Sequence, residues 1–444
     1  MIERIETLIS EKKYSEFKLE VQELKYADIA EILNDLSDES LIKFFRLLPK
    51  NIAAETFAYL EIDSQQIIIT SLTAKEAASI IDNMYADDAT DLMEEIPANV
   101  VQKILSNTTS ETRRDINQLL MYKEHSAGSI MTVEFMDIKD VMTVKDAIER
   151  IKKEAVSKET IDFCYVLSTD RKLLGTVSLK QLILTDNDVE IKEIMGTEPI
   201  AVNTHTDQEE VAKVFQKYDF TTMPVVDSED RLVGIITIDD IIDIIEEEAT
   251  EDIEKMAAIT PTDKPYMKTG VVETWKKRIP WLLILMISAT FTGKIIQSYE
   301  NALATYVILT TFIPMFMDTG GNAGGQASVT IIRGLSLNEI ELGDIFRIMW
   351  KEFKIAILCG ITLAAINFLK LVYLDRIELM VAAVVCITLV LTVLVAKIIG
   401  CSLPIIAKKI GFDPAVMASP LITTIVDALA LIIFFQIAVA MLNI

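Results

Sequence analysis

The sequence has 444 residues, of which 51% are hydrophobic and 24% are charged, and its formal net charge is −24. Residues 1–270 carry 29 Lys and Arg against 55 Asp and Glu, whereas residues 271–444 carry 13 against 11. So acidic a first part concentrates cations and repels nucleic acids and anionic lipids, which argues against a nucleic-acid-binding protein. Two histidines and four cysteines, none in a CxxC pair, argue against a zinc site.

The first segment, residues 1–128, predicts an acidic helical domain. Its apolar residues recur at a spacing of three to four and are separated by Asp, Ser or Pro. Short segments resemble one another, as in YADIAEILNDL and YADDATDLMEEI, which indicates a small solenoid of helical hairpins. The N-terminal sequence lacks an apolar stretch of signal-peptide length, so we expect this half to stay in the cytosol.

A tandem repeat follows, over about 129–188 and 189–245. Residues 166–183 align without a gap with residues 225–242, and each copy reads as strand, acidic turn, strand and helix start. This repeat resembles a pair of CBS domains, α/β modules that dimerise and often bind adenine nucleotides. In the second copy Thr237 and Asp240 fit the pattern that holds the ribose of a nucleotide, for which ATP is a candidate. The first copy has Ser178 and Gln181 at these positions, which weakens it as a nucleotide site. The alternative is a pair that serves only as a dimer scaffold.

The next segment, residues 246–270, is predicted to be an acidic linker helix. Good helix formers fill it, and nothing breaks it before Pro261. Glu248, Glu251 and Asp252 share one face of that helix, where they repel one another unless cations intervene. A solvated charged surface is the alternative interpretation.

Residues 271–444 predict a transmembrane domain of five helices, at about 280–298, 301–318, 354–374, 379–397 and 415–438. Basic residues are distributed unequally between the two ends of these stretches. One side has Lys276, Lys277, Arg278, Arg333, Arg347, Lys351, Lys354, Lys397, Lys408 and Lys409, and the other has Lys294, Lys370 and Arg376. This bias predicts a cytosolic N-terminus and an external C-terminus.

Asp427 stands at the centre of the fifth apolar stretch, where a bare carboxylate costs several kcal/mol. It therefore faces a watery path or pairs with a cation. The alternative is a carboxyl that is protonated or is held structurally by hydrogen bonds, for example from Thr423 or Thr424. One carboxylate per chain carries too little charge for a dehydrated divalent ion. A two-fold dimer brings two together, and these can hold hydrated Mg²⁺ through its waters.

The segment 314–334 combines Pro314 with four glycines, which predicts a broken helix whose carbonyls line a cavity. Asn322 and Gln326 would add the oxygen ligands that Mg²⁺ prefers. The alternative is close helix packing through small residues. Asp413, followed by Pro414, reads as a helix N-cap. It also reads as one half of a lock, sharing a cation with the linker helix.

The order of these parts resembles the MgtE family of magnesium channels over essentially the whole chain. The motifs that carry the resemblance are ATEDI after the repeat, TGGN in the second membrane stretch, and DP…P…T..D before and within the fifth. The resemblance implies a homodimer in the lipid bilayer of the plasma membrane, with the ion path between subunits. It places Asp427, Asn322 and Gly321 in the pore.

The resemblance also implies regulatory Mg²⁺ residues in the cytosolic half, in the linker or plug helix and at the pore mouth. These are Asp88, Asp91, Asp207, Glu209, Asp219, Asp240, Asp243, Glu248, Glu251, Asp252 and Asp413. One departure is Gly325, which stands where the family pattern has a second Asn, so selectivity is expected to rest more on backbone oxygens or to be looser.

Mg²⁺ uptake gated by cytosolic Mg²⁺ is thus the expected function. Two rivals are a channel or carrier for another divalent cation such as Mn²⁺ or Co²⁺, and a non-conducting membrane-tethered sensor of Mg²⁺ or nucleotide. No enzyme is expected, since the sequence has no P-loop glycine-lysine motif, nucleophile elbow or Cys/His pair at catalytic spacing.

Overall fold

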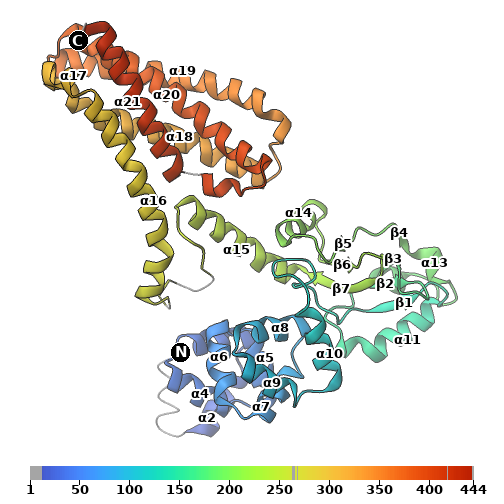
Figure 1. The fold of residues 1–444 in the computed structure, drawn as a ribbon. Coiled ribbons are helices and arrows are strands. Elements are labelled where there is room, and N and C mark those ends of the chain that lie inside the picture. The colour runs from blue at the N-terminus through green and yellow to red at the C-terminus, as the bar shows by residue number, and fades with distance from the viewer. Residues whose placement is uncertain (1–12, 263–265, 268, 418, 443–444) are drawn as a thin grey trace. The chain divides into compact units, whose positions relative to one another are not determined.

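The computed structural model describes residues 13–262, 266–267, 269–417 and 419–442, so parts of the first and linker segments lie outside the described residues (Figure 1). The chain divides into two compact units, Met1–Ile245 and Glu246–Ile444, each taken by itself.

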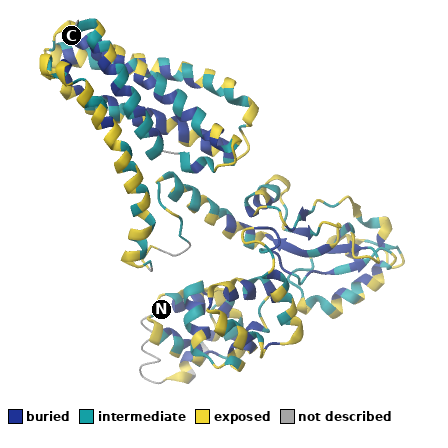
Figure 2. Ribbon diagram, in the orientation of Figure 1, coloured by how far each residue is buried: buried dark blue, intermediate teal, exposed yellow. Residues whose placement is uncertain are grey.

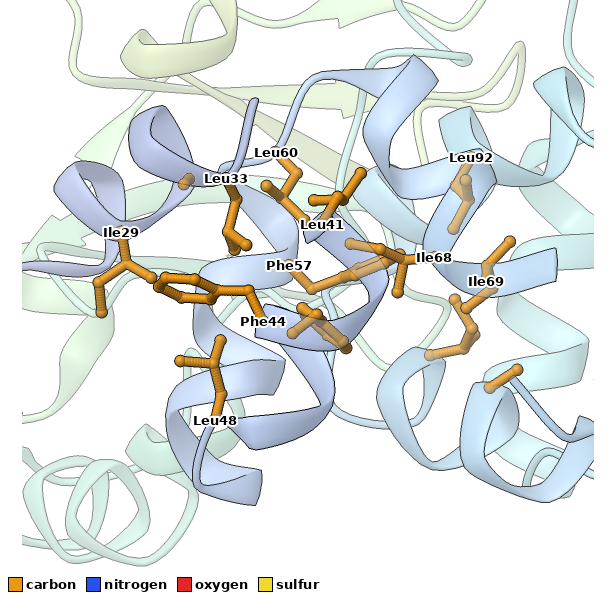
Figure 3. Close-up of a cluster of buried hydrophobic side chains, with 14 of the residues drawn as sticks. Ile29, Leu33, Leu41, Phe44, Leu48, Phe57, Leu60, Ile68, Ile69 and Leu92 are labelled. Atoms are coloured by element: carbon orange, nitrogen blue, oxygen red, sulfur yellow. The ribbon is translucent and has the colours of Figure 1, made fainter. Parts of the chain in front are cut away.

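Short helices form the first part of the first unit, as the apolar spacing predicts. They are α2 (Tyr14–Gln22), α3 (Tyr26–Asn34), α4 (Asp38–Leu47), α5 (Lys50–Ala58), α6 (Ile62–Ser71), α7 (Ala74–Ile81), α8 (Ala86–Glu95), α9 (Ala98–Leu105) and α10 (Ser110–Leu119). Their apolar faces meet in one core, in which Phe44, Phe57 and Ile68 lie close together (Figure 3). The rings of Phe17 and Phe44 pack edge to face, with 4.9 Å between centroids.

The tandem repeat folds as two small sheets. The first contains β1 (Asp137–Lys139), β2 (Phe163–Leu167), β3 (Leu173–Ser178) and β4 (Gly196–Thr197) in that order; the second contains β5 (Val202–Asn203), β6 (Thr222–Val226) and β7 (Leu232–Thr237). In each copy the first strand is parallel to the second and the second antiparallel to the third. The helices are α11 (Val144–Glu154), α12 (Leu179–Leu184), α13 (Ile191–Ile194) and α14 (Gln208–Tyr218). The predicted strand, turn, strand and helix start are confirmed in both copies.

Two contacts place the acidic residues of the first unit. Ala86 of α8 and Leu119 of α10 share a core cluster with residues of the second copy such as Phe215 and Ile241. Within the repeat, the backbones of Thr132 and Ile235 exchange two hydrogen bonds, of 2.8 and 2.9 Å. The start of α8 is therefore fixed against the second copy of the repeat.

The linker helix differs from the prediction at both ends. It is α15 (Ile238–Met256), which begins directly after β7 and ends before Pro261 is reached. Ala258 adopts a positive φ of 56°, and the N–H of Ile259 bonds back to the carbonyl of Glu254 at 2.9 Å. This turn is a C-terminal cap that ends the helix before Pro261. The prediction of one helix over residues 246–270 is therefore wrong.

Within the described part of the second unit, four segments are long and apolar enough to cross a membrane. They are Val271–Ser298, Leu342–Leu374, Leu379–Lys409 and Pro414–Leu442, which contain α16 (Val271–Ser298), α19 (Ile345–Leu369), α20 (Leu379–Lys409) and α21 (Ser419–Leu442). Figure 2 shows that much of α16 is exposed within the single chain, as expected of a helix surrounded by lipid.

The second of the five expected stretches, residues 301–318, has different bounds and a different form from the prediction. Residues 301–318 are not one helix: α17 (Glu300–Thr305) and a 3-10 helix (Val307–Phe312) precede α18 (Ile313–Ser336). Pro314 sits in the first turn of α18, where its missing N–H costs nothing, and the helix continues unbroken past every glycine. The prediction of a broken helix is therefore wrong.

The glycines of α18 instead allow close packing between helices. A Cβ on Gly320 would lie 2.8 Å from Val426, one on Gly321 2.8 Å from Thr423, and one on Gly324 2.7 Å from Ile422. Gly400 of α20 crosses α18 so closely that its own Cβ would overlap the carbonyl of Gly324. Small residues bring α18 against α20 and α21, as the alternative interpretation holds.

Lys397 is also placed differently from the prediction. It belongs to the interior of α20 rather than to a loop, and it is 6% exposed. Its Nζ lies 3.8 Å from Glu352 Oε2 of α19, which is similarly buried. A buried charge of this kind requires a partner, which Glu352 provides. Because Lys397 lies inside a helix, it no longer counts among the basic residues whose distribution predicts the orientation in the membrane.

Candidate functional site

Asp427 lies half-buried in the middle of α21. The hydroxyls of Thr423 and Thr424 donate to the carbonyl of Pro420 at 2.9 and 3.0 Å. Both hydroxyl hydrogens are therefore used in bonds to the helix backbone. This argues against the alternative in which Thr423 or Thr424 donates a hydrogen bond to Asp427. The buried cation Lys397 lies beside Glu352.

Asn322 and Gly321 lie on different faces of α18. Gly321 is buried against Thr423, where it serves the helix contact. Asn322 is exposed, and its Nδ2 donates to Oδ1 of Asp318 at 3.2 Å. Sequence reasoning missed Asp318, although a carboxylate four residues before Asn322 in a membrane stretch was the available signal.

Asp413 has a cation partner on the linker helix. Lys255 Nζ lies 2.7 Å from Asp413 Oδ2 and 2.6 Å from Glu251 Oε1. The other oxygen of Asp413 accepts from the N–H of Ala415 at 2.8 Å. Burial lowers the pKa of Lys255, but its bonds to Asp413 and Glu251 outweigh this and leave the pKa raised. Both sequence interpretations thus hold in part: Asp413 caps a helix turn and shares a cation with the linker helix, here an ammonium group.

In the first unit, carboxylates of α8 and α15 lie within range of one another's charge. Burial, followed by the charge of Asp240, raises the pKa of Asp88 to about 6. Burial also raises the pKa of Asp240 to about 6, against a hydrogen bond of 2.5 Å from the Thr237 hydroxyl. The pKa of Asp87 is raised well above its usual range by burial and by Asp88.

Three further carboxylates, Glu134, Glu159 and Asp239, complete this group. We call it the acidic cluster: Asp87, Asp88, Glu134, Glu159, Asp239 and Asp240. Burial and then Asp239 raise the pKa of Glu159 to about 8. Glu159 Oε2 is buried and has no hydrogen-bond partner among the described residues. Glu134 and Glu159 were not predicted, because they lie outside helices and strands and belong to no motif or periodic pattern in the sequence.

Local helix chemistry explains part of the cluster. Asp87 and Asp88 lie in the first turn of α8, and Asp239 and Asp240 in the first turn of α15. Acidic residues are favoured there by the partial positive charge of the helix N-terminus. This does not offset the cost of ionisation, because the pKa values of Asp87, Asp88 and Glu159 are raised first by burial and then by the neighbouring carboxylates.

The other predicted regulatory residues are spread over the surface. Asp207 caps α14 by accepting from the N–H of Glu209, Glu209 pairs with Lys213 at 2.7 Å, and Asp219 ends α14 with a φ of 53°. Asp91 and Asp243 are exposed, and Glu248 and Asp252 are partly buried. Among the described residues of the single chain, no three His, Cys, Asp or Glu converge to hold a metal ion.

Comparison with known proteins agrees with this layout. Residues 24–125 match the MgtE intracellular N domain, residues 191–247 the CBS domain, and residues 313–437 the MgtE family, described as divalent cation transporters. The magnesium transporter MgtE of Thermus thermophilus is 35% identical over 422 residues, covering 94% of this chain and 93% of the relative. The chain belongs to the MgtE family.

Other relatives extend the match. The magnesium transporter MgtE of Bacillus subtilis is 32% identical over 451 residues, covering 100% of this chain and 98% of the relative. Among solved structures, the cytosolic domain of the Mg²⁺ channel MgtE in complex with ATP superposes with a TM-score of 0.52 at 32% identity. It covers 55% of this chain and 100% of that domain. Together with the four apolar spans, these matches identify a membrane protein.

We predict that the acidic cluster destabilises α8 and α15 of this MgtE protein as the pH rises. The folded-state pKa of Asp88 lies about two units above its usual 3.8, so its ionisation opposes folding by about 3 kcal/mol once the pH exceeds 6. In EDTA, amide-exchange protection factors of α8 and the start of α15 should fall as the pH rises from about 4 to 6, where Asp88 ionises, and further towards pH 8, where Glu159 ionises. Mg²⁺ or the substitution Asp88→Asn should flatten this fall.

The control for that experiment is Asp170→Asn, which removes an exposed carboxylate from the turn between β2 and β3. Protection that is independent of pH and Mg²⁺ in the wild type would contradict the repulsive cluster.

Proposed function

We propose that this chain transports Mg²⁺ across the plasma membrane as a homodimer, with the ion path lined by α18 and α21. The observation that carries the proposal is Asp427, a carboxylate in an apolar helix whose neighbouring threonines bond to the backbone instead. Such a group requires water or a cation, and Lys397 lies against Glu352. The full-length relatives are magnesium transporters, which supports Mg²⁺ as the ion.

The charge of one chain favours a dimer. A single Asp427 carries half the charge of a divalent ion, and a two-fold axis between chains would bring two such residues to one site. Asp427 offers carboxylate oxygens and the exposed Asn322 an amide oxygen as ligands, which suit Mg²⁺ with part of its water shell retained. The other basic residues near the ends of the membrane helices favour a cytosolic N-terminus and an external C-terminus.

We further propose that cytosolic Mg²⁺ closes this path. Residues 1–270 have a net charge of −26, and the acidic cluster shows that some of these carboxylates are already close enough to resist ionisation. Mg²⁺ bound between such groups, in one chain or across the dimer, removes the repulsion and favours the compact arrangement. Acidic pairs about 4 Å apart repel by roughly 1–4 kcal/mol, so a few pairs approach the roughly 5.5 kcal/mol needed to invert a two-state equilibrium.

Lys255 indicates how the linker helix is held at the pore mouth. Its ammonium group joins Glu251 of the linker helix to Asp413. Met256, the last residue of α15, packs against Ile332 and Ala415 beside that ion pair. We infer that this docked end of the linker helix is the plug, and that Mg²⁺ at the neighbouring Glu248, Glu251 and Asp252 strengthens the docking.

The second copy of the repeat is proposed to bind ATP. Thr237 and Asp240, the two residues of the ribose-binding pattern, stand at the start of α15, where the Thr237 hydroxyl donates to Asp240. In the first copy Ser178 and Gln181 stand at the same two positions and bond to each other in the same way, but Gln181 lacks the carboxylate of the pattern. The ATP complex of a related cytosolic domain supports this proposal.

Asp427→Asn is expected to lower Mg²⁺ uptake into proteoliposomes at least tenfold, because the neutral amide no longer attracts the cation. Asp427→Glu should keep part of the flux, and Asp375→Asn, an exposed carboxylate at the end of α19, should keep all of it. Wild-type flux should be high only when Mg²⁺ on the sensor side is low. Wild-type flux from the Asp427→Asn variant would show that Asp427 is structural.

Lys255→Gln should raise the sensor-side Mg²⁺ concentration that half-inhibits uptake by about fivefold, since a partly exposed ion pair contributes about 1 kcal/mol. Lys255→Arg should stay near the wild-type value, and Lys276→Gln, an exposed lysine of α16, serves as the control. An unchanged or lower half-inhibiting concentration would rule out Lys255 as a stabiliser of the plug.

Asp240→Asn should weaken ATP binding about tenfold in equilibrium dialysis without Mg²⁺, because hydrogen bonds to a charged acceptor are worth about 1.5–3 kcal/mol. Ser178→Ala should leave ATP binding unchanged, because its partner Gln181 supplies no carboxylate and the first copy therefore lacks the ribose-binding pattern. Equal loss in both variants, or in neither, would place the nucleotide elsewhere.

A further inference from the structure

A polar stripe runs along α18 on the side opposite its glycines. It consists of Asp318, Asn322, Gln326 and Thr330, which follow one another at intervals of four and are all exposed in the single chain. Residues four apart lie on one face of a helix, so the stripe is continuous. Because of these residues and the glycines, α18 is absent from the described helices that are apolar enough to span a membrane on their own.

This stripe cannot face lipid hydrocarbon without a large loss of hydration. Yet α18 packs tightly against two apolar spans, α20 and α21, through Gly320, Gly324 and Gly400. Its polar face therefore points toward water or toward another protein surface within the membrane. A hydrated path satisfies every member of the stripe, including the charged one.

Asp318 lies at the same depth as Asp427. The helices α18 and α21 run antiparallel, as three contacts show: Phe316 with Phe434, Gly321 with Thr423, and Ser328 with the carbonyl of Met417. One turn along α21 from Thr423 leads to Asp427. Three residues back along α18 from Gly321 lead to Asp318. The rise is about 6 Å from Thr423 to Asp427 and about 4.5 Å from Gly321 to Asp318, so the two carboxylates lie at nearly the same level along the antiparallel helices.

We propose that Asp318 is a second carboxylate of the ion path and that it forms, with Asp427, one binding layer for a hydrated divalent cation. The bond from Asn322 Nδ2 fixes one oxygen of Asp318 at this level. This inference rests on the proposed pore, and it gives that pore four carboxylates per dimer instead of two. Because Coulomb attraction scales with the charge of the ion, the added pair favours divalent over monovalent cations.

The stripe also bears on Gly325, where the family pattern has a second Asn. Gly325 is buried, one place before the exposed Gln326. An oxygen ligand is therefore absent from that position of the helix, and the charge of Asp318 one turn before Asn322 compensates for it. Selectivity in this chain depends on Asp318 as well as on Asn322.

The test compares Mg²⁺ uptake into proteoliposomes by the full-length wild type and by Asp318→Asn, Asp318→Glu and Glu300→Gln. The last removes an exposed carboxylate of α17 and controls for general surface charge. Uptake is measured against external Mg²⁺ and against block by hexaamminecobalt(III), a fixed-shell analogue of hydrated Mg²⁺. Asp318→Asn should raise both the half-saturating Mg²⁺ and the half-blocking analogue concentration about tenfold, while the other two variants stay within about threefold.

A merely structural role for Asp318 would lower the number of active molecules and the maximal rate, but would leave both half-concentrations unchanged. That result would overturn the proposal. Asp427→Asn is measured in parallel: if it is silent while Asp318→Asn matches the wild type, only the role of Asp318 fails. If Asp427→Asn conducts normally, the proposed pore itself fails.

Asp318→Cys keeps the proposal testable if the Asn variant is not recovered in folded form. The native cysteines Cys164, Cys386 and Cys401 are buried, whereas Cys359 is partly exposed. The variant is therefore made together with Cys359→Ser, and Cys359→Ser alone, treated with the same reagents, is the control. A methanethiosulfonate that adds a sulfonate should return the half-saturating Mg²⁺ to near the wild-type value, whereas one that adds a trimethylammonium group should raise it further. Equal effects of the two reagents would contradict a charged layer at this position.

Discussion

A carboxylate can remain ionised away from bulk water only where water or a cation replaces the solvent that it has lost. This constraint applies in both units of the chain. In the membrane unit it acts on Asp427, whose nearest hydroxyl groups bond to the helix backbone instead. The helix α18 meets the constraint by dividing its surface, with glycines against its neighbours and polar side chains on the other face. Close packing and a continuous polar face are thus produced by one segment of sequence.

In the first unit the same constraint has a different outcome, because the carboxylates are near one another rather than isolated. Asp88 and Asp240 both have a pKa raised to about 6 chiefly by burial, and Glu159 one raised to about 8. At neutral pH ionising these groups costs free energy, and the packing of Ala86 and Leu119 into the core of the second repeat copy offsets that cost. A cation that entered the cluster would lower the cost of ionisation.

The sequence predicted those elements whose signal is local. The two copies of the repeat were predicted because alternating strands, an acidic turn and a helix start recur at one spacing, and their strand order is confirmed. Prediction from the sequence failed where contacts between distant segments determine the structure. Glycines in α18 read equally well as a broken helix or as a packing surface, and only the approach of Gly400 distinguishes them. Lys397 read as a loop residue because its partner Glu352 lies on another helix, and Glu159 joins the acidic cluster only through folding.

The linker helix connects the two forms of the constraint. Its first turn contains Asp239 and Asp240, members of the acidic cluster, and its last turn contains Lys255, which contacts Asp413. Burial raises the pKa of Asp240 to about 6 at the first turn. In the last turn, by contrast, one ammonium group contacts both Glu251 and Asp413 and neutralises part of their charge. One helix thus shows both outcomes of the constraint: carboxylates that resist ionisation, and carboxylates that remain ionised because a cation replaces the lost solvent.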